Sequence, residues 1–162
     1  NFILAQINIS SWKNLSVNFA GRELNVLPNY FTKFPSDNWP TRNIVYRHLD
    51  KKTCGGKNLL VFPDNRYLSV LAFEYYLSIS DKKIHAEPAR DYYDPVHDEI
   101  FDIGKLNEFN CILTKTGNPG VFSNKNVMNF VSTYLGKNSD YRSIYFNAPD
   151  SSVVTLFVKK EN

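Results

Sequence analysis

The chain has 162 residues, of which 43% are hydrophobic, 15% aromatic and 22% charged, and its formal net charge at pH 7 is +3. This length suits one main domain whose core needs neither a metal nor a disulfide, and no apolar run approaches the ~20 residues of a membrane span. Its lysine pairs, Lys51-Lys52, Lys82-Lys83 and Lys159-Lys160, are separated in the sequence. Nucleic-acid binders usually gather such residues into a patch or stripe, so we expect no nucleic-acid partner.

The first part of the chain, residues 1–36, is expected to be a lead-in segment with short strands. Apolar residues alternate from Ile3 to Ile9, and a second short strand is expected from Leu24 to Leu27. Because the chain begins with Asn1 rather than Met, we expect it to be a piece of a longer polypeptide. The proline-bracketed stretch FPSDNWP then leads into the main domain, residues 37–162.

The main domain is expected to begin with a helix after Pro40, with Ile44, Val45, His48 and Leu49 on one face. The apolar run from Leu59 to Phe62 is typical of a strand buried on both faces, as in a parallel sheet covered by helices. A helix follows this strand. Its expected core face consists of apolar residues at helical spacing: Leu68, Leu71, Ala72, Tyr75, Tyr76 and Ile79.

The second half continues the alternation of strands and helices. A strand is expected at Ile84–Glu87, and the acidic stretch 91–102 forms a loop before a short helix near Phe101–Leu106. Cys111–Thr114 is expected to be a third buried strand. Ser123 or Asn124 caps the next helix, whose expected face is Val127, Phe130, Val131, Tyr134 and Leu135. A hairpin formed by 141–146 and 153–158 closes the chain.

This order predicts an α/β fold: a Rossmann-like three-layer domain with a mixed sheet, mainly parallel, with a C-terminal antiparallel hairpin. In a 2-1-3 strand order, the strands at Leu59 and Ile112 are neighbours. Cys54 and Cys111 then lie near the same, amino-terminal, edge of the sheet. Without a paired spacing, the first interpretation of these cysteines is two free buried thiols. The alternative is a disulfide between them, which is sterically allowed and would indicate an oxidising compartment.

The strongest candidate for ligand binding is the turn after the first buried strand, with Asp64, Asn65 and Tyr67. Ligands of open α/β sheets bind at the carboxyl ends of strands, and a helix amino terminus can hold an anion. However, the turn lacks the glycines of a dinucleotide fingerprint or a P-loop. Asp64 and Asn65 acting only as helix caps are therefore the alternative.

No catalytic, metal or cofactor site is expected in this domain. The stretch 94–99 holds Asp, His, Asp and Glu side chains but not the four spaced ligands of structural zinc. His85 fits a hydrogen-bonded histidine better than a pH sensor or catalyst. A metal-dependent nuclease using Asp64 with Glu87 or Lys83 is a third, weaker hypothesis, because the spacing of these residues is loose.

Four segments, in order, resemble the extracytoplasmic carboxy-terminal domain of polytopic membrane glycosyltransferases related to dolichyl-phosphate-mannose protein mannosyltransferases. The segment 57–76, with VFPDNRYLSVLAFEYY, resembles the opening strand, Pro-Asp turn and helix of that domain. The stretch 37–49 is similar to its lead-in, and CILTKTGNPG at 111–120 resembles its strand with a Lys-Thr-Gly turn. APDSSVVTLF at 148–157 resembles its terminal hairpin, although Ser151 stands where that family typically has Gly, which predicts a wider turn.

The resemblance implies a glycosyltransferase that takes a sugar from a polyprenyl-phosphate donor, with its catalytic residues in loops of the membrane portion. This domain would be accessory, handling acceptor or donor or covering the active site, and inactive by itself. Its implied partners are the membrane-spanning portion of the same polypeptide and a lipid-linked sugar or acceptor. It would be anchored through N-terminal spans on the extracytoplasmic side. A free-standing Rossmann-like module that binds a small ligand or carbohydrate is the alternative.

Overall fold

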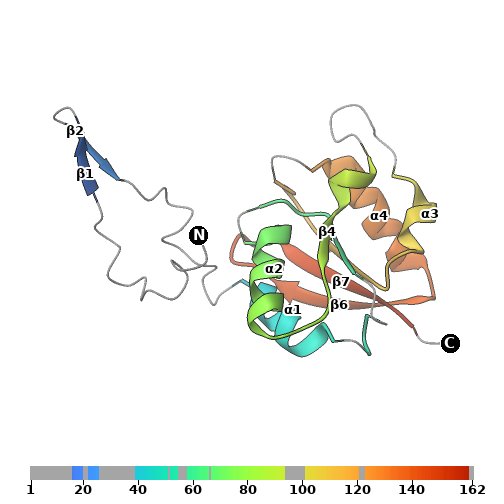
Figure 1. The fold of residues 1–162 in the computed structure, drawn as a ribbon. Coiled ribbons are helices and arrows are strands. Elements are labelled where there is room, and N and C mark those ends of the chain that lie inside the picture. The colour runs from blue at the N-terminus through green and yellow to red at the C-terminus, as the bar shows by residue number, and fades with distance from the viewer. Residues whose placement is uncertain are drawn as a thin grey trace. The chain divides into compact units, whose positions relative to one another are not determined.

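The chain forms two compact units, Asn1–Ser36 and Asp37–Asn162, and is shown as a computed structural model in Figure 1. The structure describes residues 16–19, 22–25, 39–50, 52–54, 58–65, 67–93, 101–120 and 123–160. In the first unit, β1 (Ser16–Phe19) pairs antiparallel with β2 (Arg22–Asn25). The strand β2 overlaps the one expected at Leu24–Leu27, while the one expected at Ile3–Ile9 lies outside the described residues.

The second unit is a mixed α/β domain, as predicted. Its elements, in order, are α1 (Thr41–His48), β3 (Leu59–Val61), α2 (Val70–Ile79), β4 (Ala86–Pro88), the 3-10 helix η3 (Ala89–Tyr92), α3 (Ile103–Leu106), β5 (Cys111–Lys115), α4 (Lys125–Lys137), β6 (Tyr141–Asn147) and β7 (Val153–Lys159). No described helix has both the length and the apolar character needed to cross a membrane.

The five strands form one mixed sheet in the order β4-β3-β5-β7-β6. Strands β4 and β5 both run parallel to β3, which confirms the 2-1-3 order predicted for the three parallel strands. The C-terminal hairpin joins antiparallel, with β7 next to β5 and β6 at the edge. The carboxyl ends of β4, β3 and β5 therefore share an edge with the beginning of β7.

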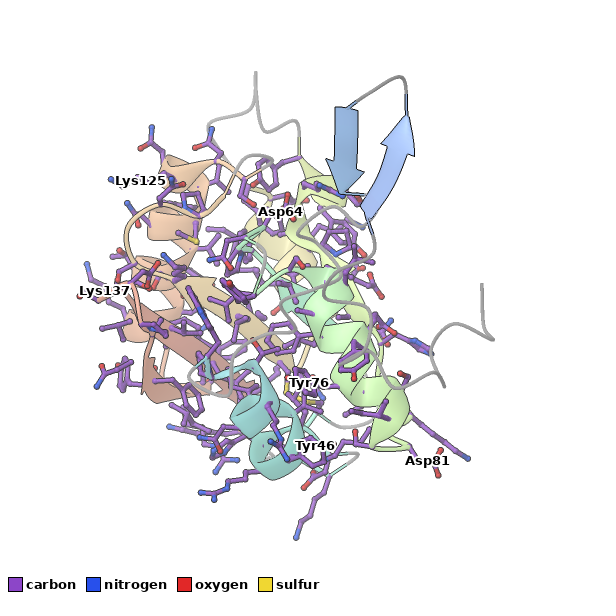
Figure 2. All side chains as sticks on the ribbon, turned by 90° about the vertical axis from the view of Figure 1, so that its left-hand side faces the viewer. Tyr46, Asp64, Tyr76, Asp81, Lys125 and Lys137 are labelled. Atoms are coloured by element: carbon purple, nitrogen blue, oxygen red, sulfur yellow. A yellow bond between two sulfur atoms is a disulfide. The ribbon has the colours of Figure 1, made fainter. Side chains whose placement is uncertain are left out.

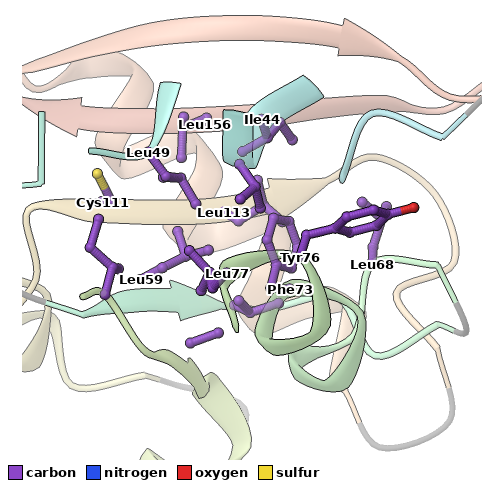
Figure 3. Close-up of a cluster of buried hydrophobic side chains, with 14 of the residues drawn as sticks. Ile44, Leu49, Leu59, Leu68, Phe73, Tyr76, Leu77, Cys111, Leu113 and Leu156 are labelled. Atoms are coloured by element: carbon purple, nitrogen blue, oxygen red, sulfur yellow. The ribbon is translucent and has the colours of Figure 1, made fainter. Parts of the chain in front are cut away.

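Alternate residues of the central strands belong to two separate core clusters, because successive side chains of a strand point to opposite faces. Leu59 and Leu113 pack with residues of α1 and α2 in one cluster, shown in Figure 3. Leu60 and Ile112 pack in the other, which contains residues of α3 and α4. Burial of β3 on both faces confirms the interpretation of its uninterrupted apolar run.

The core face of α2 agrees with the prediction only in part, since Leu68, Ala72 and Tyr76 are buried as expected. Its buried residues are Ala72, Phe73, Tyr76 and Leu77. The stripe Leu71, Tyr75 and Ile79, which was expected to face the core, is exposed, with Leu71 at 81%. The sequence VLAFEYYLSI is apolar around most of the helix, so spacing alone does not identify the side that meets the sheet.

The helix α4 begins after Asn124, whose side chain accepts hydrogen bonds from the N–H groups of Asn126 and Val127. This confirms one of the two predicted caps. The expected core residues Phe130 and Tyr134 are instead exposed, while Met128 is fully buried. The C-terminal hairpin has the predicted strands.

Candidate functional site

The candidate site lies at the carboxyl edge of the parallel strands, where three turns meet. These are the turn of Asp64 and Asn65 after β3, the turn of residues 116–120 after β5, and the turn of residues 148–152 between β6 and β7. Asp64 forms a parallel bridge with Gly120, and the side chain of Lys115 pairs with Asp150. Segments as far apart in sequence as Asp64 and Asp150 thus form one connected edge, which we call the motif edge.

The main chain of Asp64 is fixed against the second turn. Its N–H donates to the carbonyl of Pro119 at 2.6 Å. Gly120 approaches so closely that a Cβ there would lie 2.1 Å from the carbonyl oxygen of Asp64, and its φ is +116°. Both the contact and the backbone conformation therefore require glycine at this position. The hydroxyl of Ser123 donates to the carbonyl of Phe62, just after β3, at 2.5 Å.

The side chains of the predicted turn residues have different roles. The carboxylate of Asp64 lies 3.2 Å from the guanidinium of Arg90, and both side chains are partly exposed. The amide oxygen of Asn65 accepts from the N–H groups of Tyr67 and Leu68, at 3.0 and 2.9 Å. Asn65 therefore caps the turn ahead of α2, as the capping alternative expects, whereas Asp64 caps nothing and forms an ion pair.

Tyr67 anchors the turn to the segment that precedes α1. Its ring stacks on Trp39, with the ring centroids 4.8 Å apart and the planes at 21°. Its carbonyl accepts a hydrogen bond from the hydroxyl of Thr41, a buried residue. Tyr67 follows Asp64 by three residues, so the turn carries an aromatic pair as well as a charged one.

Lys115 links the second and third turns. Its side chain is only 2% exposed, and its ammonium group lies 2.9 Å from the carboxylate of Asp150. The same group donates to the carbonyls of Thr116 and Asn118 at 3.2 and 3.0 Å. Partial burial acts to raise the pKa of Asp150, but hydrogen bonds from Ser152 and Lys115 outweigh it, so this pKa is lower than usual. Asp150 is therefore the anionic partner of a buried cation.

The hairpin turn contains a left-handed residue, Ser151, at the position where the resembled family typically has Gly. Ser151 has a φ of +63°, in the left-handed region. Its N–H donates to the carbonyl of Ala148 at 3.0 Å, and the N–H of Ala148 donates to the carbonyl of Ser152 at 2.9 Å. Three residues thus span the turn, as in hairpins where a left-handed residue follows a type I turn, so it is wider than the two-residue form.

The residues of the nuclease hypothesis have other partners. Both carboxylate oxygens of Glu87 accept hydrogen bonds, one from the side-chain amide of Asn58 and the other from the hydroxyl of Tyr92. The hydrogen bond from Tyr92 to Glu87 is the main cause that raises the pKa of Tyr92 to about 12, and burial of Tyr92 is the second. His85 is exposed and lies 3.7 Å from the carboxylate of Glu74. No three His, Cys, Asp or Glu side chains gather within the described ranges, and the stretch 94–99 lies outside them.

At the opposite, amino-terminal edge of the parallel strands, Cys54 and Cys111 form a disulfide. Both residues are fully buried in the cluster beneath α1 and α2. The bond connects the turn after α1 to the first residue of β5. Of the two alternatives for these cysteines, the structure contains the disulfide rather than the free thiols.

The motif edge has the chemistry of a polar binding surface. It offers the Asp64–Arg90 pair and the backbone groups of its turns, but its carboxylates are paired with cations, so neither is poised as a general base. Sequence reasoning did not identify Arg90, Lys115 or Asp150. The available signal was Lys115 itself, a lysine directly after the buried residues 111–114 and therefore in need of a buried counter-ion.

Comparison with the models of known protein families, with curated proteins and with solved structures found no match.

Proposed function

We propose that this domain is the extracytoplasmic, accessory part of a membrane-embedded glycosyltransferase that transfers a sugar from a polyprenyl-phosphate donor. In this proposal catalysis belongs to the membrane portion of the same polypeptide. The domain admits or orients the lipid-linked donor or the acceptor at the motif edge. It is anchored through spans that precede it in the polypeptide.

The observation that carries the proposal is the motif edge itself. Three of the segments that resemble the mannosyltransferase-related family contribute its three turns, through the contacts of Asp64 with Gly120 and of Lys115 with Asp150. If the resembling segments only stabilised their own turns, the three turns would not need to contact one another. A shared edge at the carboxyl ends of parallel strands is where α/β domains bind their ligands.

The disulfide supports the extracytoplasmic location. Disulfides form and persist in secreted and extracytoplasmic proteins and are rare where glutathione and thioredoxin keep thiols reduced. Cys54 and Cys111 are both fully buried, so their bond is part of the core of the domain. A core of this kind suits a domain that folds after translocation.

We further propose that the architecture is the Rossmann-like three-layer type. In its favour, the parallel strands have the 2-1-3 order of doubly wound sheets. Residues of α1 and α2 also contribute to one core cluster and residues of α3 and α4 to the other. The antiparallel β6–β7 hairpin extends that arrangement at one edge.

The proposal is tested by sugar transfer in membranes that contain the full polypeptide. The substrates are a panel of polyprenyl-phosphate sugars that includes the mannose form, and the variants are Asp64→Ala and, as a control away from the motif edge, Asp140→Ala. We expect Asp64→Ala to raise the KM for donor or acceptor severalfold with kcat within about twofold, because the domain affects binding and not chemistry. Absence of transfer with every donor contradicts the proposal, and a loss of kcat beyond about 100-fold contradicts the accessory role.

A second candidate is a free-standing module that binds a small ligand or carbohydrate. It is favoured by the stacked rings of Trp39 and Tyr67 and by the Asp64–Arg90 pair, because aromatic and polar groups together suit sugar recognition. Titration of the chain with a glycan and nucleotide panel, followed by chemical shifts, should then give saturable binding that Asp64→Ala weakens. A flat response across the panel rejects this candidate.

A further inference from the structure

A basic hollow lies at the amino-terminal edge of the parallel strands, opposite the motif edge. It has a volume of about 340 Å³, at the lower end of the range for small-molecule sites. Four of its six lining residues carry a positive charge. The lining residues are Lys52, Thr53, Arg142, Val158, Lys159 and Lys160. Lys52 therefore lies near Lys159 and Lys160, although they are far apart in the sequence.

The fold brings these residues together through strand pairing and the disulfide. Arg142 of β6 lies opposite Val158 of β7 in the antiparallel ladder. Val158 in turn lies opposite Cys111, the first residue of β5. Because Cys111 is bonded to Cys54, the turn that carries Lys52 and Thr53 is held beside the hairpin. The hollow is thus built on a cross-linked part of the core and not on a free loop.

Within the described part of the chain, none of the four cations of the basic hollow forms an ion pair. The carboxylate of Asp50, two residues before Lys52, faces Thr53, whose backbone nitrogen lies 2.5 Å away. This hydrogen bond, followed by one from the Thr53 hydroxyl, lowers the pKa of Asp50. Asp50 therefore stays anionic but serves the turn itself. The side chains of Lys52, Arg142 and Lys160 are exposed.

The charge of Arg142 also acts on His48, the last residue of α1. Partial burial, followed by the charges of Arg142 and Arg47, lowers the pKa of His48. His48 packs edge-on against the ring of Phe146 and is therefore held close to β6. The arginine charges are the lesser cause of this shift, but they act in the direction that favours an anion near β6.

We propose that the basic hollow binds a phosphate group, carried either by a free phosphorylated molecule or by a lipid headgroup. A phosphate brings up to two negative charges and three acceptor oxygens, which a guanidinium can bind in a bidentate manner while ammonium groups act as point charges. Val158 adds an apolar, buried side chain to the lining, so the charged donors come from the three lysines and Arg142. This inference concerns a different surface from the motif edge and holds whether or not the proposed function does.

The test measures binding of two probes to the whole chain by calorimetry and co-sedimentation. The first probe is inorganic pyrophosphate, and the second is vesicles of phosphatidylcholine with 30 mol% phosphatidylglycerol, compared with phosphatidylcholine alone (a fraction of about 30% gives a strongly anionic surface). We expect saturable binding of at least one probe. Binding of pyrophosphate identifies a free phosphorylated ligand, and binding of the anionic vesicles alone identifies a lipid headgroup.

Single variants of the exposed cations separate a built site from net charge. Lys52→Gln and Arg142→Gln should each weaken binding by about fivefold, as expected for one charge removed at contact distance in water. Lys125→Gln removes the same charge at the start of α4, toward the end of the domain where Asp64 lies (Figure 2), and should change binding by less than about twofold.

Three results overturn the inference. They are the absence of binding to both probes, an equal loss of affinity in Lys125→Gln and the hollow variants, and tighter binding of a single-stranded oligonucleotide than of either probe. Circular dichroism melting of each variant checks that the domain remains folded. We expect this because the substituted side chains, Lys52 and Arg142, are exposed.

Discussion

The disulfide between Cys54 and Cys111 should contribute strongly to the stability of the domain. It joins positions 57 residues apart, and closing a loop of this length in the unfolded chain is worth about 4 kcal/mol in the chain-entropy model. Small domains have a free energy of unfolding of about 5–15 kcal/mol, so reduction should remove a large share of it. This domain would then be only marginally stable in a reducing compartment.

Urea unfolding with and without a phosphine reductant measures this contribution. A typical urea dependence of about 2 kcal/mol per molar predicts that reduction lowers the midpoint by about 2 M. The variant Cys54→Ala/Cys111→Ala serves as the control, because the reductant should leave its midpoint unchanged. Equal midpoints for the oxidised and reduced wild type would refute the reasoning, as would two alkylated thiols in protein unfolded without reductant.

Three further predictions follow from the buried cation, the hairpin turn and the corrected face of α2. Asp150→Asn should lower the free energy of unfolding by about 2 kcal/mol, because it leaves the buried ammonium group of Lys115 without a counter-ion. Lys115→Met should lower it by only about 1 kcal/mol, because the carboxylate of Asp150 is partly exposed and can be solvated. Since the pKa of folded Asp150 is lowered, its stabilisation is complete above pH about 4 and is lost as the pH falls through the lowered pKa, so Asp150→Asn should flatten the acid side of the stability profile. Ser151→Gly should raise the free energy of unfolding by about 0.5 kcal/mol, since relief of a left-handed backbone exceeds the added chain entropy, and a lower melting temperature would contradict this. Leu71→Gln should change the free energy of unfolding by less than about 0.5 kcal/mol, whereas Phe73→Ala should lower it by about 4 kcal/mol. A larger loss in Leu71→Gln than in Phe73→Ala, measured by urea unfolding, would show that Leu71 faces the core as the spacing predicted.

The strands and their order could be predicted because the signals were local and consistent. The uninterrupted apolar run at Leu59 admits only a strand buried on both faces, and its position before a helix selects parallel neighbours. The final hairpin was similarly clear, since a proline-containing turn separates two β-prone runs. Fold class therefore followed from periodicity and turns alone.

The faces of the helices could not be predicted with the same success. In α2, Leu71 and Phe73 are both apolar, and only docking on the sheet decides that Phe73 is buried and Leu71 exposed. The same holds in α4, where Met128 is buried in the core and Phe130 is exposed. Hydrophobic periodicity gives the helix, but tertiary packing selects its inner side when apolar residues surround it.

The polar contacts of both edges depend on residues far apart in sequence. Asp64 was identified because it follows a strand, but its partner Arg90 lies beyond α2 and β4 and carries no local pattern. The basic hollow shows the same limit. Lys52 and Lys159 belong to different lysine pairs, and no local pattern in the sequence connects them. The disulfide and the β6–β7 ladder bring them together.

The central claim, that this domain belongs to a membrane-embedded glycosyltransferase, is tested most directly by the membrane association of the full polypeptide. Membranes of the source cells are extracted with alkaline carbonate, and the polypeptide is detected with an antibody raised against residues 37–162. An integral membrane protein is expected to remain in the pellet and to be released only by detergent. Complete release into the carbonate supernatant, together with an upstream reading frame that encodes no hydrophobic span, would contradict the account.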